Sequence, residues 1–487
     1  MDVGELTRGP VARAALGVLM ASFPGTELPG WLTPAVSGLG GVCLFGENVP
    51  DLPTARRLCD ELHTLAPGTV VLVDEEGGNV TRLQAAEGSD LPGNAALGVV
   101  DDLDLTGRAG RALGGLLHAV GVDVDLAPCL DVASEPWNPV IGTRSFGADP
   151  ASVARHGAAF VAGVRAGGSG TCAKHYPGHG ATSVDSHVAL PVLDVGLDEL
   201  ERRDLPPFRS AVAAGVDAVM TAHVVVRALG EGPASLEPWS SRMLRRSGFA
   251  GPVVTDALGM RAVGDDLGAA AVAAVAAGAD LLCLDAPQER DAEAMLWQAW
   301  TALVAAVSDG RLELVRLQRS ASRNRALGLR AAQRRARPRP ELAAALEGLA
   351  AVGREAAERS LGVDGDVVRR GPVQLVDLRP RQNLAAGRTT SAFGTALAGR
   401  LQALGQAGPV PSDQPLPDGG TTLVLVREPH PEREEGRALA ALLAERPDAV
   451  VVHTGLPATA PSAGRRVLCH GVGRANAQAV MERVLPG

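Results

Sequence analysis

The sequence predicts an α/β protein in which a (β/α)8 barrel of the TIM type precedes a smaller α/β sandwich domain. Eight short apolar runs recur within the first 285 residues, stretches of helical periodicity separate them, and a shorter alternation of the same kind follows residue 366. Strands that alternate with helices pair in parallel, and eight such units are what a closed barrel requires. An open doubly wound sheet is the alternative if one of the eight runs is not a strand.

The candidate strands of the barrel each end in small, polar or charged residues. They cover residues 16–22, 41–45, 70–74, 122–127, 171–175, 218–223, 252–256 and 280–285. Helical periodicity extends over residues 52–65, 105–119, 151–166, 200–214, 262–277 and 288–333.

The arginine-rich stretch 334–340, with its two prolines, predicts a boundary between two domains. A basic run this short is typical of a solvated connector. Beyond it we expect a helix over 341–361, strands over 373–378, 422–427, 449–453 and 467–471, and helices over 391–404, 432–445 and 475–484. The expected units are a barrel over residues 1–333, a linker and helix over 334–365, and the sandwich domain over 366–487. The strands of this second domain end without a cluster of titratable residues, so a structural or accessory role is expected.

Composition argues against several classes of protein. The net charge of −9 and the aromatic content of 3% offer neither a basic surface nor stacking platforms for nucleic acid, so no nucleic-acid partner is expected. The six cysteines form no CxxC pair and no spacing of metal ligands, so no metal or other cofactor is expected. The first residues do not resemble a signal peptide, and no apolar stretch predicts a membrane span, which favours a cytoplasmic location. The oligomeric state stays open.

Titratable residues gather at the ends of the predicted strands. Asp74, Lys174, His175, His223 and Asp256 all occupy such ends. In a barrel of parallel strands these ends surround the active site. The fold and the candidate site therefore support each other.

The most unusual stretch runs from Ala173 to His187. It contains Lys174, the only lysine in a chain with 45 arginines, together with three histidines. An ammonium group is compact enough to lie between several oxygens, whereas the planar guanidinium is not. Asp185 and His187 are two residues apart and can share one face of an extended loop, an arrangement used for proton transfer. A histidine–aspartate contact without a catalytic role is the alternative.

The two carboxylates at strand ends also allow plainer interpretations. Asp256 can serve as a helix N-cap, a position that favours aspartate. Asp74 can bind a metal or hold a polyol through hydrogen bonds, and no histidine or asparagine spacing nearby supports the metal.

At these residues the chain resembles glycoside hydrolase family 3, specifically its β-N-acetylglucosaminidases. The motifs follow the order of the family: D-E-E-G-G at 74–78 with Arg82, I-G-T-R-S-F-G at 141–147, K-H-Y-P-G-H-G at 174–180 with D-S-H at 185–187, M-T-A-H at 220–223, and T-D at 255–256. They spread over the first 290 or so residues, and their combination is highly specific. The second domain resembles the sandwich of two-domain members more weakly.

The resemblance implies a role for each matching residue. Asp256 matches the nucleophile that forms a glycosyl-enzyme, and His187 with Asp185 matches the acid/base dyad of the N-acetylglucosaminidase branch. Residues that match those holding the terminal sugar are Asp74, Arg82, Arg144, Lys174 and His175. Two positions depart from the family: Asn79 stands where many members carry a basic residue, and Tyr176 replaces the commoner phenylalanine.

The resemblance leads to a functional expectation with two alternatives. We expect a retaining exo-acting β-N-acetylglucosaminidase that hydrolyses terminal β-linked N-acetylglucosamine from peptidoglycan fragments or chitooligosaccharides, with an amino-sugar saccharide as its partner. The first alternative is a phosphorylase on the same scaffold, because a histidine acid/base tolerates phosphate as acceptor. The second is a non-enzymatic sugar-binding barrel.

Overall fold

The computed structural model describes residues 9–184, 189–288, 290–380 and 392–486. Its largest sheet contains eight strands in the order β10-β1-β2-β3-β4-β5-β7-β9, and every neighbouring pair is parallel. A parallel bridge between Val254 and Leu281 joins the two ends of this order, so the sheet closes on itself. The predicted barrel is confirmed, and the open doubly wound sheet is not formed.

All eight predicted barrel strands are present, most of them shorter than the apolar runs that predicted them. Their bounds are β1 Leu19–Ala21, β2 Gly41–Leu44, β3 Val70–Val73, β4 Val124–Asp125, β5 Gly170–Tyr176, β7 Ala218–Thr221, β9 Val253–Thr255 and β10 Leu282–Cys283. A separate pair, β6 Val192–Leu193 and β8 Val225–Val226, lies outside the barrel.

The helices of this half surround the barrel. They are α2 Pro10–Leu16, α3 Thr33–Val36, α4 Leu52–Leu65, α5 Asn94–Val100, α6 Leu103–Val120, α7 Pro150–Gly167, α8 Leu197–Arg203, α9 Leu205–Ala213, α10 Pro238–Arg246, α11 Leu267–Ala277, α12 Ala292–Ser308 and α13 Leu314–Arg335. Helices α2, α3, α5 and α10 are not among the helices predicted from the sequence.

Two predicted helices are interrupted for identifiable reasons. The helix expected over 200–214 is divided into α8 and α9 at Asp204, because prolines at the start of α9 lack the N–H that a continuous helix needs. The helix expected over 262–277 begins only at Leu267, where Asp266 accepts a hydrogen bond from the backbone N–H of Ala269 and caps α11. Gly264 precedes this cap, and its positive φ of 88° is incompatible with a continuous right-handed helix.

The alternation of residues along each strand separates two layers of the core. Val70 and Leu72 on β3 lie inside the barrel, whereas Val71 and Val73 pack against the surrounding helices. Cys43, Cys172 and Cys283 belong to the interior cluster, where they act as small hydrophobic residues. Because alternate residues share a face, positions 74, 174 and 256 continue the inward-facing rows of β3, β5 and β9 at the barrel mouth.

The opposite end of the barrel is held by buried ion pairs, and here the sequence interpretation was wrong. The first two arginines of the basic run, Arg334 and Arg335, end α13 and do not belong to a solvated connector. Arg334 is 9% exposed, and its Nη2 lies 2.6 Å from Asp217 Oδ1. Arg335 Nη1 lies 2.5 Å from Asp123 Oδ1, ahead of β4. These two arginines therefore bind residues at the amino-terminal ends of β7 and β4.

The second half of the chain forms the predicted α/β sandwich. Its sheet has the order β11-β15-β14-β13-β12, and its strands are β11 Gly362–Asp364, β12 Val373–Asp377, β13 Thr421–Val426, β14 Val450–His453 and β15 Arg466–Leu468. Strand β11 was not predicted and pairs antiparallel with β15. Helices α15 Ala392–Ala403 and α17 Arg474–Val484 pack on one face of the sheet, and α16 Glu434–Glu445 packs on the other.

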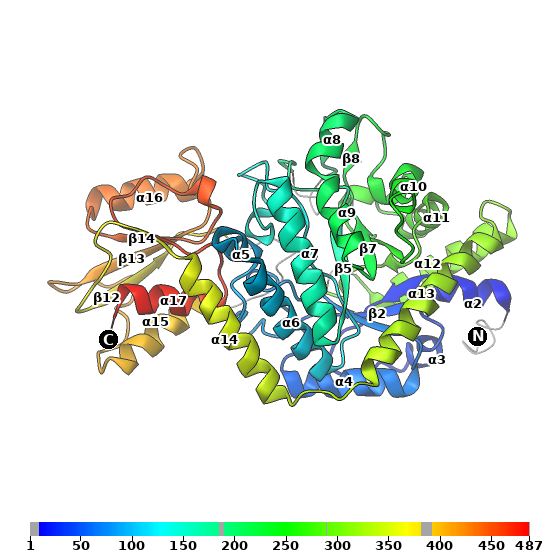
Figure 1. Cartoon of the computed structure of the whole chain (residues 1–487), viewed down its shortest axis with the longest axis horizontal. Helices are drawn as coiled ribbons and strands as arrows, with labels where there is room; N and C mark the ends of the chain where they lie inside the picture. The colour runs from blue at the N-terminus through cyan, green and yellow to red at the C-terminus, as the bar shows by residue number, and fades with distance from the viewer. Residues whose placement is uncertain (1–8, 185–188, 289, 381–391, 487) are drawn as a thin grey trace.

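Helix α14 (Leu342–Ser360) packs against α6 of the barrel and α17 of the sandwich (Figure 1). A further contact joins Arg474 Nη2 to Asp90 Oδ2 at 2.6 Å. The division at residues 333 and 366 stays a prediction. No helix within the described ranges is long and apolar enough to cross a membrane.

Candidate active site

Lys174, on β5, lies between two carboxylates at the barrel mouth. Its Nζ is 2.6 Å from Asp74 Oδ1 and 2.6 Å from Glu76 Oε1. The residue is 2% exposed, and burial opposes its charge, but Asp74 and Glu76 outweigh this effect and raise the pKa of Lys174. The expectation of an ammonium group shared between several oxygens is confirmed by these two contacts.

Glu76 is a residue that the sequence analysis quoted in a motif but gave no role. Arg144 binds it with two hydrogen bonds, from Nε to Oε2 at 2.9 Å and from Nη2 to Oε1 at 2.7 Å. Burial acts against the carboxylate, yet Arg144 and Lys174 hold the pKa of Glu76 well below its usual range. Glu76 thus fixes Arg144 and Lys174, two of the cations that the family resemblance places around the sugar.

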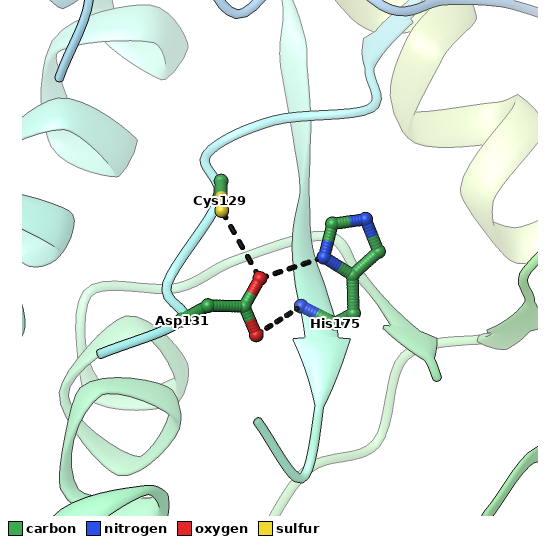
Figure 2. Close-up of side chains that lie close together, drawn as sticks. All are labelled: Cys129, Asp131 and His175. Atoms are coloured by element: carbon green, nitrogen blue, oxygen red, sulfur yellow. Dashed lines mark hydrogen bonds and ion pairs between the residues drawn. The ribbon is translucent and has the colours of Figure 1, made fainter. Parts of the chain in front are cut away.

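His175 is oriented by Asp131, which follows β4. Its Nδ1 lies 2.7 Å from Asp131 Oδ2, and Arg144 Nη2 lies 3.3 Å from its Nε2 (Figure 2 shows the first contact). Arginine can only donate a hydrogen bond, so Nε2 accepts and Nδ1 carries the proton. Asp131 therefore fixes the tautomer of His175, a positioning role that the sequence analysis missed.

Cys129, Asp131 and His175 are close enough to hold a metal ion as a group, but their hydrogen bonds indicate another role. The Cys129 thiol donates to Asp131 Oδ2 at 3.1 Å (Figure 2). Burial, with the charge of Asp131, raises the pKa of this thiol well above its usual value, so it remains protonated. In this arrangement the thiol serves as a hydrogen-bond donor to the carboxylate. We interpret the cluster as support for His175.

Asp131 also holds the loop that follows β5. Its Oδ1 accepts the backbone N–H of His179 at 2.7 Å, and His179 Nδ1 lies 2.7 Å from Thr182 Oγ1. Burial lowers the pKa of His179 to about 4, so this ring is neutral at pH 7. These contacts give His179 a role in shaping the loop.

Arg82 lies next to the same network. Its Nη2 is 3.7 Å from Asp74 Oδ2, and its backbone N–H donates to Glu75 Oε2 at 2.8 Å. Leu83 N–H donates to the same oxygen at 2.8 Å. Glu75 therefore anchors the chain that carries Arg82, and burial raises the pKa of this acid.

Asp256 directly follows β9 at the barrel mouth and is half-buried. Its backbone N–H donates to Thr221 O at 3.0 Å, and its Oδ1 accepts the N–H of Ala257 at 2.9 Å. It does not cap a helix, since α11 begins at Leu267 and is capped by Asp266. The plainer interpretation of Asp256 was therefore wrong.

His223, after β7, stabilises the turn beyond Asp256. Its Nε2 lies 2.9 Å from Ala257 O, and its Nδ1 lies 2.6 Å from Ser235 Oγ. The carbonyl can only accept, so Nε2 carries a proton and donates it. Asp185 and His187, the predicted acid/base dyad, lie outside the residues that the structure describes.

The comparisons with known proteins agree with this fold. The family profile described as the glycosyl hydrolase family 3 N-terminal domain matches residues 29–327. A beta-hexosaminidase of Neisseria meningitidis serogroup B is 38% identical over 273 residues, which are 53% of this chain and 73% of the relative. A beta-hexosaminidase of Thiobacillus denitrificans is 38% identical over 256 residues, 50% of this chain and 71% of the relative.

Among solved structures, a glycoside hydrolase family 3 beta-N-acetylglucosaminidase from a Paenibacillus species matches with a TM-score of 0.84 and 28% identity. The match covers 96% of this chain and 95% of that one. A beta-glucoside phosphorylase matches with a TM-score of 0.77 but only 18% identity, over 97% of this chain and 92% of that one, and shares the fold alone.

The barrel with its polar mouth is that of a glycoside hydrolase. The chain belongs to glycosyl hydrolase family 3.

Proposed function

We propose that this chain is a retaining exo-acting β-N-acetylglucosaminidase that releases terminal β-linked N-acetylglucosamine. The broader class, a glycoside hydrolase of the β-N-acetylhexosaminidase type, follows from the family and from its beta-hexosaminidase relatives. Peptidoglycan fragments or chitooligosaccharides are the proposed substrates. In a cytoplasm, the location that the sequence favours, these would be recycled or imported fragments.

The observation that carries the proposal is the position of Asp256. It is a half-buried carboxylate at the mouth of a family 3 barrel, on the inward-facing row of β9. A retaining glycosidase needs such a carboxylate to attack the anomeric carbon and form a covalent glycosyl-enzyme, which water then hydrolyses. We assign this nucleophilic role to Asp256.

The proton donor in this proposal is His187, with Asp185 orienting its ring. Retaining enzymes commonly use two carboxyl groups, of which one protonates the leaving group. A neutral imidazole does not repel the nucleophilic carboxylate, and its unperturbed pKa of about 6.5 suits both donating and accepting a proton near neutrality. This assignment rests on the family motif.

The terminal sugar would be held by Asp74, Arg82, Arg144, Lys174 and His175. The first four form a connected set of ion pairs through Glu76, so their positions are fixed before substrate arrives. Sugar hydroxyls both donate and accept hydrogen bonds, which suits a site that presents carboxylates and cations side by side. Fixed partners also reduce the ordering cost of binding.

Hydrolysis is favoured over the two alternatives. The phosphorylase neighbours are 17% and 18% identical and support only the fold, whereas the beta-hexosaminidase relatives reach 38% over most of their own length. A non-enzymatic barrel does not agree with membership of the glycoside hydrolases. Incubating the protein with a nitrophenyl N-acetyl-β-glucosaminide, with and without phosphate, tests this choice. We expect free sugar under both conditions, and a phosphate-dependent sugar 1-phosphate would contradict the proposal.

The nucleophile is tested by Asp256→Ala. We expect turnover to be lost while thermal unfolding stays close to that of the wild type. Asp265→Ala is the matched control, because this carboxylate is exposed and lies on the same loop. Near-normal activity of Asp256→Ala would exclude its role.

The proton donor is tested by His187→Ala on two substrates that differ in leaving group. We expect the variant to hydrolyse chitobiose far more slowly than the wild type and to lose less activity on the nitrophenyl glycoside, because an activated phenolate leaves without protonation. An equal loss on both substrates would refute general-acid catalysis by His187.

A further inference from the structure

A narrow polar hollow lies beside Arg144, where the second domain meets the barrel mouth. Barrel residues Asn79, Gly142 and Arg144 line one side, and Arg427 and Glu428 line the other. The hollow has a cavity volume of about 30 Å³. This is room for a hydroxyl or hydroxymethyl group and not for a second sugar ring.

The two residues from the second domain are held firmly. They follow β13, and the carboxylate of Glu435 on α16 accepts both of their backbone N–H groups, that of Glu428 at 3.0 Å. The segment beyond them contacts the barrel: His430 packs edge-on against Trp137 with ring centroids 4.8 Å apart, and Arg433 lies over the same ring at 5.6 Å. The loop is therefore part of the barrel mouth.

The hollow contains polar groups without hydrogen-bond partners. Asn79 Oδ1 and Arg427 Nε are buried, and neither has such a partner among the residues that the structure places. The Glu428 side chain is 13% exposed, and its closest cations, Arg427 Nε at 3.9 Å and Arg433 Nη1 at 3.8 Å, lie beyond hydrogen-bonding distance. Burial raises the pKa of Glu428. Leaving such groups unsatisfied costs about 1–3 kcal/mol each, so a ligand group that completes them gains affinity.

We propose that this hollow is a subsite for one hydroxyl or hydroxymethyl group of the terminal sugar and that Arg427 and Glu428 of the second domain bind it. This inference rests on the proposed function and deepens it. A hydroxyl group donates one hydrogen bond and accepts others, which suits a hollow lined by a carboxylate, an amide and a guanidinium side chain. Because Arg427 and Glu428 balance each other in charge, the hollow suits a neutral group better than a phosphate or a carboxylate.

A subsite of this kind would give the second domain more than the structural or accessory role expected from the sequence. Arg144 is the shared wall, with its guanidinium bound to Glu76 in the sugar site and its side chain lining the hollow. The second domain would then determine which sugar substituent is accepted.

The test combines Glu428→Ala with nitrophenyl N-acetyl-β-glucosaminides that lack the 3-, 4- or 6-hydroxyl group. On the complete sugar we expect kcat/KM to fall about 10- to 100-fold, the range of a lost hydrogen bond to a charged group. On the one deoxy substrate that lacks the bound hydroxyl, the same substitution should change kcat/KM less than threefold. Glu428→Gln, which keeps the shape and one acceptor, should show a smaller loss with the same substrate pattern and guards against a folding defect.

Glu432→Gln is the matched control, since this residue lies on the same segment and is exposed. It should behave like the wild type on every substrate. An equal loss for Glu428→Ala on all four substrates, or no loss on any, overturns the subsite. A wild-type protein that hydrolyses no hexosaminide refutes the proposed function instead, so the two failures can be told apart.

Discussion

Replacing Lys174 by arginine tests whether the site needs a compact cation. The wild-type Nζ contacts Asp74 and Glu76 at 2.6 Å each, in a side chain that is 3% exposed. Lys174→Arg keeps the positive charge, so the two carboxylates stay neutralised. Any loss of kcat/KM or of stability in this variant then reflects the shape of the cation and not its charge.

The magnitude follows from these contacts. A guanidinium is larger than an ammonium and is planar, so it cannot occupy the same point between two oxygens. Inserting extra volume into a packed site costs about 1–3 kcal/mol of stability. If the contact with Asp74 or Glu76 is also lost, the transition state loses about 2 kcal/mol of stabilisation, which corresponds to about a 30-fold decrease in kcat/KM.

The assay is kcat/KM on the nitrophenyl N-acetyl-β-glucosaminide together with the free energy of unfolding in urea. Lys174→Met is the second variant and should be less stable still, because removing one partner of a buried ion pair costs about 3–5 kcal/mol. Arg202→Lys, at a side chain that is 68% exposed, is the control for exchanging lysine and arginine at a position outside the site. If Lys174→Arg retains kcat/KM within threefold of the wild type, the reasoning from ammonium geometry is wrong.

Two further predictions concern groups away from the nucleophile. Asp131→Asn should lower the free energy of unfolding by about 2–4 kcal/mol, because the new amide would present N–H groups to the donors of Cys129 and His175. It should also reduce kcat/KM by a similar factor on chitobiose and on the nitrophenyl glycoside, which differ in leaving group. An unchanged melting temperature would contradict this prediction. Burial lowers the pKa of His453 to about 3, so the unfolded state binds more protons between pH 6.5 and that value, and stability falls as pH falls through this window. Between pH 6.5 and 4.5 the loss is about 2 kcal/mol for this group. His453→Gln should therefore show a shallower pH dependence of the free energy of unfolding in urea, whereas parallel curves would refute the assignment.

The regular elements were largely predictable because they follow from local patterns. Each barrel strand is an apolar run, and the barrel order follows from strands that alternate with helices. The breaks within the predicted helices have local causes that the spacing of apolar residues does not reveal, such as the prolines at the start of α9. Strand β11 has too little apolar character to be recognised alone and exists because it pairs with β15, about a hundred residues further along the chain.

The residues at strand ends were predictable for the same reason, whereas their partners were not. Position 174 lies on an inward-facing row of a barrel strand, so a sequence pattern is sufficient to place Lys174 at the mouth. Its contact with Glu76, and the contact of Glu76 with Arg144 across 68 residues, depend on how separate loops fold over the barrel. The positioning role of Asp131 follows only from the four hydrogen bonds that its carboxylate accepts in the folded chain.

The sequence by itself determined the barrel, the sandwich, the family and the position of Asp256 after β9, because periodicity and short motifs are local properties of the chain. The tertiary structure decided which charges meet and which domain reaches the site. The Arg427–Glu428 segment follows an ordinary buried strand, and nothing in its neighbourhood along the chain indicates a ligand. Only the docking of α14 and of the His430 loop on the barrel brings it beside Arg144.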